Sequence, residues 1–322
     1  MSVILLIAEI IFIGGLIVGL YQKNTNLICK SKKRLDGKTV IVTGGTSGMG
    51  LEIAIDFAHR GAKVIVACPF EDEGYNGKKK IIESSGNENV IFKFLDLSSL
   101  ESVRKFAADI LQTEDRLDIL VNNAGLGTGG RRTTADGMNF IMQVNYFGSF
   151  LLTLLLLPLL KKTGESQEPS RIVNTASVLH SLGRINFKNW NEPKMNIFSY
   201  SNSKMCVVLF TRELAKRLKK SNVVVSAVDP GAVGTKIFLT AVGRGFGSFV
   251  SFIFLVLFKQ PWEGAQTAIY AAVSNSAGKV SGEFFRNCKI ARPASRCYDD
   301  KLAMKVWEES IRLVKLKDEE CI

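Results

Sequence analysis

The sequence predicts an α/β protein with a doubly wound parallel sheet, preceded by one N-terminal transmembrane helix. From residue 38 onward, short β-branched runs alternate with longer amphipathic stretches, and no repeat or Pro/Gly-rich linker divides them. The first 22 residues contain a long apolar run. With 322 residues, 46% of them hydrophobic, the chain can bury the core of one large domain with appendages.

The N-terminal apolar run comes first along the chain. Residues 3–20 are apolar except for Glu9, and as a helix they would extend roughly 27 Å, enough to span a bilayer. Five basic residues follow the run: Lys23, Lys30, Lys32, Lys33 and Arg34. In a cleaved signal peptide, basic residues instead precede the apolar run. We therefore expect a transmembrane signal anchor over 1–22 and a basic juxtamembrane linker over 23–37. An interfacial hairpin is the alternative.

The charge pattern also predicts orientation and location. By the positive-inside rule, the N-terminus is luminal and the rest of the chain cytosolic. We expect the endoplasmic reticulum membrane, with lipid droplets and the outer mitochondrial membrane as alternatives. A formal charge of +12 is compatible with nucleic-acid binding. The sequence has no basic helix interleaved with aromatic residues, however, so we expect no nucleic-acid partner.

Cysteine and histidine usage argues against two classes of site. The six cysteines are scattered without a C-x-x-C pair, and the two histidines are His59 and His180. We expect no metal site and no disulfide framework.

The elements of the sheet follow in order. Strands are expected at 39–42, 64–67, 90–95, 119–121, 172–175 and 223–228. Helices are expected to begin near Gly48, Glu73, Leu100, Asp136, Phe198 and Glu263. One domain over 38–290, with an apolar lid over 235–258, is followed by a C-terminal tail helix over 291–322.

A glycine-rich turn follows the first expected strand and leads into a helix. Glycines let the backbone approach a pyrophosphate, and the helix N-terminus offers unpaired N–H donors. Many glycine-rich turns have no function, but the position between strand and helix favours dinucleotide binding. The candidate cofactor-binding residues of this turn are Gly44, Thr46, Ser47, Gly48, Met49 and Gly50.

The G-x-x-x-G-x-G spacing and the motifs after it resemble the short-chain dehydrogenase/reductase family, covering roughly residues 38 to 285. These motifs are Asp96-Leu97, Asn122-Asn123-Ala124-Gly125, Asn145, Ser177, Tyr200-Ser-Asn-Ser-Lys204, and Pro230-Gly231 with Thr235. The resemblance implies a Rossmann-type fold and a nicotinamide cofactor. It implies further cofactor-binding roles for Asp96, Leu97, Asn123, Ala124, Gly125, Tyr200, Lys204, Pro230, Gly231 and Thr235.

Tyr200, Lys204, Ser177 and Asn145 are the candidate catalytic residues. A phenol has a pKa of about 10 and is a poor base at neutral pH. Lys204 follows at i+4 on the same helix face, so its ammonium is expected to lower the pKa of Tyr200 and to reach the ribose hydroxyls. Tyr200 then acts as general acid/base, and Ser177 binds the substrate oxygen. The resemblance implies that Asn145 holds a proton-relaying water.

These residues also have structural interpretations. A Tyr and a Lys at i and i+4 are usually surface neighbours, and a Ser after a strand is usually a helix cap. Asp96 fits a cap of the helix near Leu100, and the two asparagines fit a strand end. The ordered set of motifs favours the functional interpretation of Tyr200, Lys204 and Ser177.

The end of the second strand, Ala67-Cys68-Pro69-Phe70, bears on cofactor choice. An acidic residue there usually bonds the adenosine ribose of NAD, and a following Arg accommodates the 2′-phosphate of NADP. Cys68 occupies the acidic position, and Pro69 stands where retinol dehydrogenases carry Arg. We expect weak discrimination, with NAD(H) and NADP(H) both usable.

Three segments bear on the substrate. Tyr200 follows Ser177 by 23 residues, and the insert 180–190 resembles the longer loop of the retinol-dehydrogenase branch. His180 either lines the pocket or is satisfied by backbone groups. Residues 228–235 and 257–272 resemble the X-linked dehydrogenase/reductase subgroup, which implies polyprenol and dolichal substrates as well as retinoids.

The expected function is therefore hydride transfer between a nicotinamide cofactor and a lipid alcohol, giving its aldehyde or ketone, at a membrane. The apolar stretch 246–258 either contacts the membrane or is a buried helix. The apolar run 151–160 has no expected membrane role, because family members use this helix for core packing and for a homodimer contact. Alternatives are a hydroxysteroid or other lipid carbonyl reductase, and a non-catalytic cofactor-binding scaffold.

Overall fold

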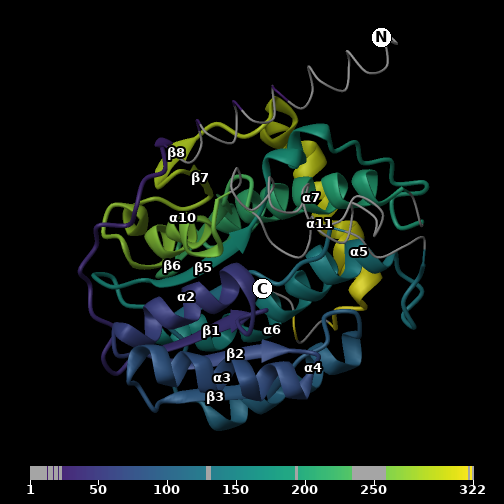
Figure 1. Cartoon of the computed structure of the whole chain (residues 1–322). Helices are drawn as coiled ribbons and strands as arrows, with labels where there is room; N and C mark the ends of the chain where they lie inside the picture. Colours follow the sequence, from purple (N-terminus) through teal and green to yellow (C-terminus); the bar gives the residue numbers. More distant parts are fainter. Residues whose placement is uncertain are drawn as a thin grey trace, which may run out of the picture.

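The computed structural model describes residues 24–127, 132–192, 195–233, 259–317 and 320, together with 13, 17 and 21. These residues form an eight-stranded sheet in the order β3-β2-β1-β4-β5-β6-β7-β8 (Figure 1). The pairs from β3 to β7 are parallel, and β8 is antiparallel to β7. The strands are β1 Thr39–Thr43, β2 Lys63–Cys68, β3 Val90–Phe94, β4 Ile119–Asn122, β5 Ser170–Thr175, β6 Val223–Asp229, β7 Glu283–Arg286 and β8 Lys289–Ala291.

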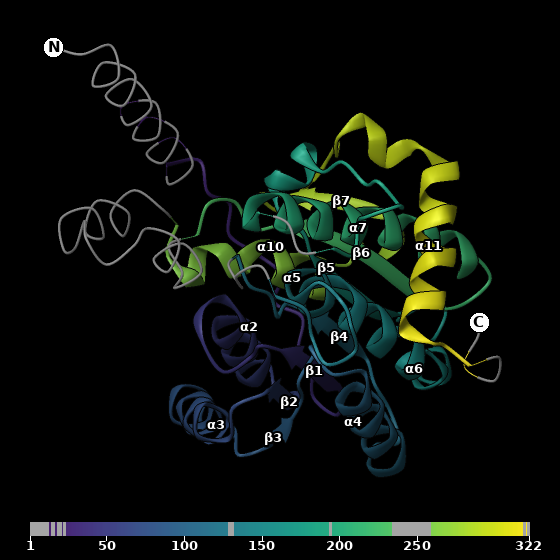
Figure 2. The ribbon, with the colours of Figure 1, turned by 90° about the vertical axis from the view of Figure 1, so that its right-hand side faces the viewer.

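Helices cover both faces of the sheet, as Figure 2 shows. They are α2 Gly48–His59, α3 Glu71–Ser85, α4 Leu100–Thr113, α5 Phe140–Met142, α6 Gly148–Thr163, α7 Asn196–Arg217, α10 Pro261–Val273 and α11 Asp300–Val314. Short turns are the π-helical η1 Gln143–Phe147 and the 3₁₀ turns η2 Val178–Leu182, η3 Ala277–Lys279 and η4 Ser295–Tyr298. The predicted Rossmann-type fold is confirmed.

The central strands are apolar because both of their faces are covered. Every residue of β1, β4, β5 and β6 is buried, as expected for parallel strands between two helical layers. One core lies under α4, α6, α7 and α11, and the other under α2, α3 and α10. The sheet therefore holds its loops on a rigid, water-free support.

The helical stretch Phe140–Thr163 is the one in the described part of the chain that is long and apolar enough to cross a membrane, yet 89% of its apolar window is buried. It is a core helix, consistent with the expectation for 151–160. Outside it, α11 packs on α6 and α7 through Trp307, whose ring lies 5.3 Å from that of Phe150 and 5.9 Å from that of Phe210. The outer surface of α6 and α7 is thus partly occupied by the chain's own last helix.

Most predicted elements lie within two residues of their expected positions. The fourth helix is the exception: it begins at Phe140 rather than near Asp136. Residues 134–138 instead form a turn closed by the Gly137 amide on the Thr134 carbonyl, and the Asn139 side chain accepts a hydrogen bond from the Met142 amide. An Asn cap of this kind sets the start of a helix.

Two strands were missed. β7 and β8 are too short to show alternation, and the turn joining them places Asn287 and Cys288 at φ 51° and 54°, a left-handed conformation for which the expected turn signal is glycine. β8 runs to Ala291, across the domain boundary expected at 290. The helix described within the expected tail, 291–322, is α11.

Two expected segments fall outside the described residues. Apart from Ile13, Ile17 and Tyr21, the signal anchor over 1–22 is not described, and the lid over 235–258, with Thr235, is not described either. The three described anchor residues are helical, with exposed fractions of 54%, 62% and 68%.

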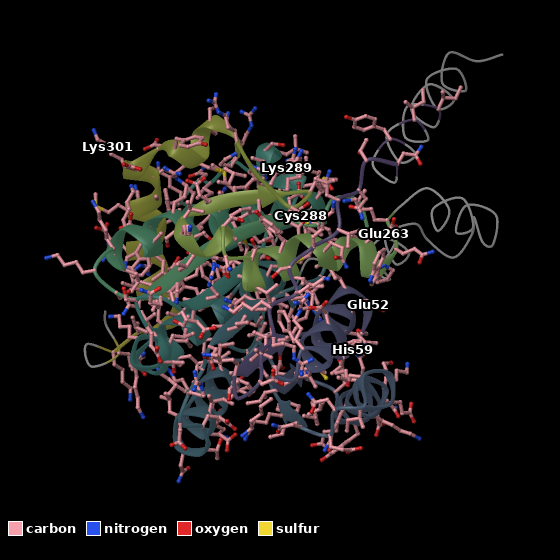
Figure 3. All side chains as sticks on the ribbon, turned by 90° about the vertical axis from the view of Figure 1, so that its left-hand side faces the viewer. Glu52, His59, Glu263, Cys288, Lys289 and Lys301 are labelled. Carbon is pink, nitrogen blue, oxygen red and sulfur yellow. The ribbon has the colours of Figure 1, made fainter. Side chains whose placement is uncertain are left out.

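The linker after the anchor lies against the catalytic domain. The Leu27 amide donates to Asn287 Oδ1 at 2.7 Å, and Asn287 Nδ2 donates to the Thr25 carbonyl at 2.7 Å. The Cys29 amide donates to Gln266 Oε1 of α10 at 3.1 Å. Figure 3 shows the linker passing Cys288, in the turn between β7 and β8, and Lys289, at the start of β8. The segment nearest the expected anchor is therefore held on the domain surface.

Candidate active site

The candidate site lies at the carboxyl ends of β1, β4, β5 and β6. The neighbours of β1 are β2 and β4, so the strand order reverses beside it. In open α/β sheets, ligands bind in the crevice at such a switch point.

The glycine-rich turn requires glycine at its closest approaches. Gly44 has φ +63°, and its amide donates to the Ala67 carbonyl at 2.7 Å. A Cβ on Gly50 would lie 2.1 Å from the Gly44 oxygen and 2.4 Å from Nδ2 of Asn123. The turn leads into α2 at Gly48, whose first amides form an anion-binding end. These groups fit the pyrophosphate of a dinucleotide.

Asn123 and Ala124 hold this turn. Asn123 Nδ2 donates to the carbonyls of Thr43 and Gly44, at 3.0 and 3.4 Å. The amides of Asn123 and Ala124 both donate to Thr43 Oγ1 at 3.1 Å. The Asn123 side chain is thus engaged in shaping the turn rather than free for a ligand.

Asn145 lies in the π-helical turn between α5 and α6, and such turns are frequent at functional sites. Its Oδ1 accepts from the Leu126 amide at 2.8 Å, and its Nδ2 donates to the Leu126 carbonyl at 2.9 Å and to Ser203 Oγ at 3.1 Å. A Cβ on Gly125 would lie 3.2 Å from Asn145 Oδ1 and 3.5 Å from Lys204 Nζ. Gly125 therefore keeps these two side chains close.

Ser177, Tyr200 and Lys204 come together where β5 and α7 meet. Ser177 caps η2, and its side chain lies close enough to the Tyr200 hydroxyl to lower the pKa of the phenol. Lys204 Nζ donates to the Thr175 carbonyl at 2.8 Å and lies 5.6 Å from the centre of the Tyr200 ring. The sequence positions predicted as a group are a group in space.

The expected direction of the pKa shift at Tyr200 is wrong for this structure. Burial raises the pKa of Tyr200, the hydrogen bond with Ser177 lowers it, and the charge of Asp229 raises it. Burial lowers the pKa of Lys204 to about 8, opposed by Asp229. Desolvation dominates because it penalises the charged form of both groups. At neutral pH, Tyr200 is therefore a phenol and Lys204 mainly an ammonium.

Five other predicted residues have local roles. Asp96 Oδ1 accepts from the amide and hydroxyl of Ser98, at 2.8 and 2.7 Å, and Leu97 is buried. Met49 packs on the α10 face of the core. Gly231 has φ +81°, and its amide donates to Asp229 Oδ1 at 3.0 Å. Pro230 lies between Asp229 and Gly231 in this turn.

Asp229 was missed as a site residue. It is 1% exposed, and its Oδ2 accepts from Arg286 Nε at 2.8 Å. Its charge raises the pKa of Tyr200, Lys204 and His180. An acidic residue at the end of a buried strand was the available signal, but its ion pair comes from β7, a strand that the sequence did not reveal.

His180 is held by backbone groups. Its Nε2 accepts from the Ala294 amide at 3.0 Å, which leaves the proton on Nδ1, and Nδ1 donates to the Ser177 carbonyl at 2.6 Å. Its pKa is lowered by burial and raised by the Ser177 bond. His180 thus ties the main chain of Ser177 to the segment after β8.

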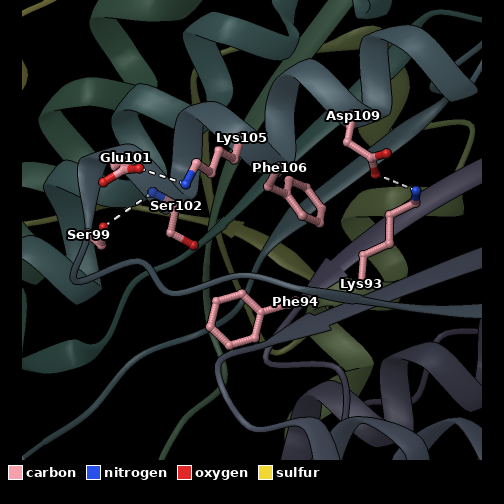
Figure 4. Close-up of a pocket in the computed structure, with 8 residues that line it drawn as sticks. All are labelled: Lys93, Phe94, Ser99, Glu101, Ser102, Lys105, Phe106 and Asp109. Atoms are coloured by element: carbon pink, nitrogen blue, oxygen red, sulfur yellow. Dashed lines mark hydrogen bonds and ion pairs between the residues drawn. The ribbon is translucent and has the colours of Figure 1, made fainter.

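A pocket of about 530 Å³ lies elsewhere, between the edge strand β3 and α4 (Figure 4). It is lined by Lys93, Phe94, Ser99, Glu101, Ser102, Lys105, Phe106 and Asp109, and contains none of the predicted site residues. The candidate active site is therefore defined by Ser177, Tyr200 and Lys204 and not by this pocket. Among the described residues, no group of three or more His, Cys, Asp or Glu could hold a metal ion.

The fold and the Ser-Tyr-Lys arrangement define a class of enzyme. The short chain dehydrogenase family model matches residues 38–242. The chain belongs to this family, as the motifs predicted, and it is an NAD(P)-dependent oxidoreductase acting on CH–OH groups.

Individual relatives cover nearly the whole chain. Human retinol dehydrogenase 13 is 40% identical over 95% of this chain and 93% of its own length. Human dehydrogenase/reductase SDR family member 13 is 38% identical over 96% of this chain and 83% of its own. Among solved structures, an uncharacterised protein from Mycobacterium paratuberculosis superposes with a TM-score of 0.71 at 27% identity, over 90% of this chain and 98% of that one. The RhlG/NADP complex of Pseudomonas aeruginosa gives 0.64 at 25%, over 79% and 95%.

Proposed function

We propose that this chain is a membrane-bound oxidoreductase that interconverts isoprenoid alcohols and their aldehydes or ketones. The observation that carries the proposal is the convergence of Ser177, Tyr200 and Lys204 beside a dinucleotide-type turn, in a chain 40% identical to a retinol dehydrogenase over most of its length. Retinoids are the first substrates to test. Longer polyprenols follow from the resemblance of residues 228–235 and 257–272.

The proposed roles follow from the contacts. When bound, the nicotinamide cofactor supplies or accepts the hydride. In reduction, the Tyr200 phenol donates its proton to the carbonyl oxygen, which Ser177 holds by a hydrogen bond. The Lys204 ammonium stabilises the phenolate left behind. In oxidation, Tyr200 accepts the proton.

Asn145 and Gly125 shape the space next to Lys204. Three hydrogen bonds to Leu126 and Ser203 hold the side-chain amide of Asn145 in one orientation. The direction of its oxygen atom is therefore fixed. We propose that this oxygen and Lys204 Nζ hold the water through which the proton of Tyr200 exchanges with solvent.

Binding to a membrane is proposed from the N-terminal residues. Ile13, Ile17 and Tyr21 follow each other at one-turn spacing in helical conformation and are exposed. Exposed apolar side chains at the end of a long apolar run are stable in lipid. The linker bonded to Asn287 and Gln266 would hold the catalytic domain close to that surface. We propose the endoplasmic reticulum membrane, with the domain cytosolic, and the domain limits given above.

The test is turnover by detergent-solubilised full-length protein. Retinol, a long polyprenol and a hydroxysteroid are each supplied with NAD and NADP, and the corresponding carbonyl compounds with NADH and NADPH. We expect turnover of an isoprenoid pair, lowered about 10²- to 10⁴-fold by Tyr200→Phe, since that is the usual contribution of a positioned general acid or base.

The matched control is Tyr270→Phe, which removes a hydroxyl bonded to Ser276 at 2.9 Å, near the end of α10. Its activity should equal that of the unmodified protein. Turnover of the hydroxysteroid and of no isoprenoid would contradict the proposed substrate class and show that the enzyme acts on steroids. No turnover of any pair in either direction would favour a non-catalytic scaffold.

A further inference from the structure

Glu73 lies where the glycine-rich turn meets the first turn of α3. Its Oε1 accepts hydrogen bonds from Thr46 Oγ1 and from Ser47 Oγ, each at 2.8 Å. The contact depends on close packing, because a Cβ on Gly77 would lie 2.8 Å from the Cα of Thr46. The fold therefore fixes a carboxylate against two residues of the proposed cofactor turn.

The charge around this contact is negative. The first turn of α3 carries Glu71, Asp72 and Glu73, so three carboxylates oppose the attraction that a helix N-terminus has for anions. At the end of β2, Cys68 and Pro69 supply no cation. A 2′-phosphate on the adenosine ribose would meet repulsion here, whereas a neutral hydroxyl would not.

The hydrogen bonds favour the same cofactor form. Thr46 and Ser47 donate their hydroxyl protons to Glu73 and so cannot donate them to phosphate oxygens. A carboxylate has about four acceptor positions, so Glu73 can still accept from ribose hydroxyls. In NAD enzymes the acidic residue that does this stands at the end of the second strand, a place occupied here by Cys68.

We propose that Glu73 selects NAD(H) over NADP(H), by accepting hydrogen bonds from the adenosine ribose and repelling a 2′-phosphate. The selecting carboxylate thus comes from α3 rather than from the end of β2. It provides the discrimination between NAD(H) and NADP(H) that Cys68 and Pro69 do not provide. The inference rests on the cofactor site of the proposed function and is independent of the substrate.

The test is binding of NADH and NADPH to the full-length protein without substrate, followed by nucleotide fluorescence. Glu73→Gln removes the charge and keeps an amide oxygen that can accept from Thr46 and Ser47. We expect NADH to bind about tenfold more tightly than NADPH in the unmodified protein, an effect typical of one charge near the protein surface. In Glu73→Gln, NADPH should bind about tenfold more tightly than before, and NADH should change less than about threefold.

Glu83→Gln is the matched control. It removes the same charge from the same helix, where Glu83 pairs with Lys79 at 3.8 Å, and it should leave both affinities unchanged. Adding Pro69→Arg to Glu73→Gln should strengthen NADPH binding again.

The outcomes separate this inference from the proposed function. Equal affinities in the unmodified protein, or an unchanged ratio in Glu73→Gln, would overturn the role of Glu73 and leave the oxidoreductase proposal standing. Failure to bind either dinucleotide would overturn both. A shifted ratio without turnover of any isoprenoid pair would overturn the proposed substrate class alone.

Discussion

The two ends of the candidate site are built differently. At the catalytic end, Lys204 and His180 are 4% and 2% exposed and are held by carbonyl or amide groups of the backbone. At the adenosine end, Ser47 and Glu73 are exposed and are held by a contact between side chains. Because the catalytic end is buried, the loss of one charged group there should strongly lower the reaction rate. Solvent screens the exposed contact at the adenosine end, so a change there should alter only the relative affinity for NADH and NADPH.

The largest expected effect is at Lys204, a buried charge at the catalytic end. Lys204→Met should lower kcat/KM about 10²- to 10⁴-fold, because it removes the ammonium that stabilises the phenolate of Tyr200. Steady-state rates with retinaldehyde and the preferred dinucleotide measure this. Lys216→Met, on the same helix where Lys216 pairs with exposed Asp300, should leave the rate unchanged. Equal rates in Lys204→Met and the unmodified protein would contradict the proposed role.

The pH dependence of reduction is the next test. The pKa of Lys204 is lowered to about 8, so the ammonium is present below that pH and is lost above it. Reductive kcat/KM for the cofactor should fall as the pH rises through about 8, by about tenfold per unit well above that value. Circular dichroism at each pH checks that the protein stays folded. A profile that is flat from pH 7 to 10 would show that the ammonium is not required.

His180 should have a smaller effect, since it acts through the main chain of Ser177. His180→Ala should lower kcat about tenfold and the free energy of unfolding by about 1–3 kcal/mol, the usual effect of leaving buried polar groups unpaired. His59→Ala, at the exposed end of α2 (Figure 3), is the control. Loss of stability without any change in kcat would make His180 purely structural.

The pH dependence of the free energy of unfolding tests the role of His180 further. The pKa of His180 is lowered in the folded protein, so the unfolded chain binds the proton more readily. The contribution of His180 to stability is present above the unfolded pKa of about 6.5 and is lost as the pH falls through the folded pKa. Denaturant unfolding at several acidic pH values should show a smaller loss in His180→Ala than in the unmodified protein.

Much of the fold could be predicted because its signals are local. Each of the six predicted strands is a short β-branched run. The cap at Asn139 was missed, and the fourth helix was therefore expected too early, near Asp136. The turn joining β7 to β8 could not be predicted, because Asn287 and Cys288 take up a left-handed conformation without glycine. Contacts with the linker and with α10 support that turn.

The candidate residues could be predicted because catalysis needs particular chemical types in a particular order, and Ser177, Tyr200 and Lys204 provide them. Their electrostatics could not be predicted in the same way. The sequence spacing of Tyr200 and Lys204 predicts a lowered phenol pKa, but desolvation depends on all surrounding elements. Asp229 adds a charge that is paired with Arg286 of β7.

The sequence by itself determined the family, the doubly wound sheet and the glycine-rich turn, because these depend on residue type and on spacing along one strand or helix. The tertiary structure alone decided which elements bury the apolar stretch Phe140–Thr163, with α4 packed on α6. It also decided that α11 covers α6 and α7, and that Glu73 meets the cofactor turn. These depend on residues far apart in sequence being brought together, and hydrophobic burial acts on such contacts without regard to their separation along the chain.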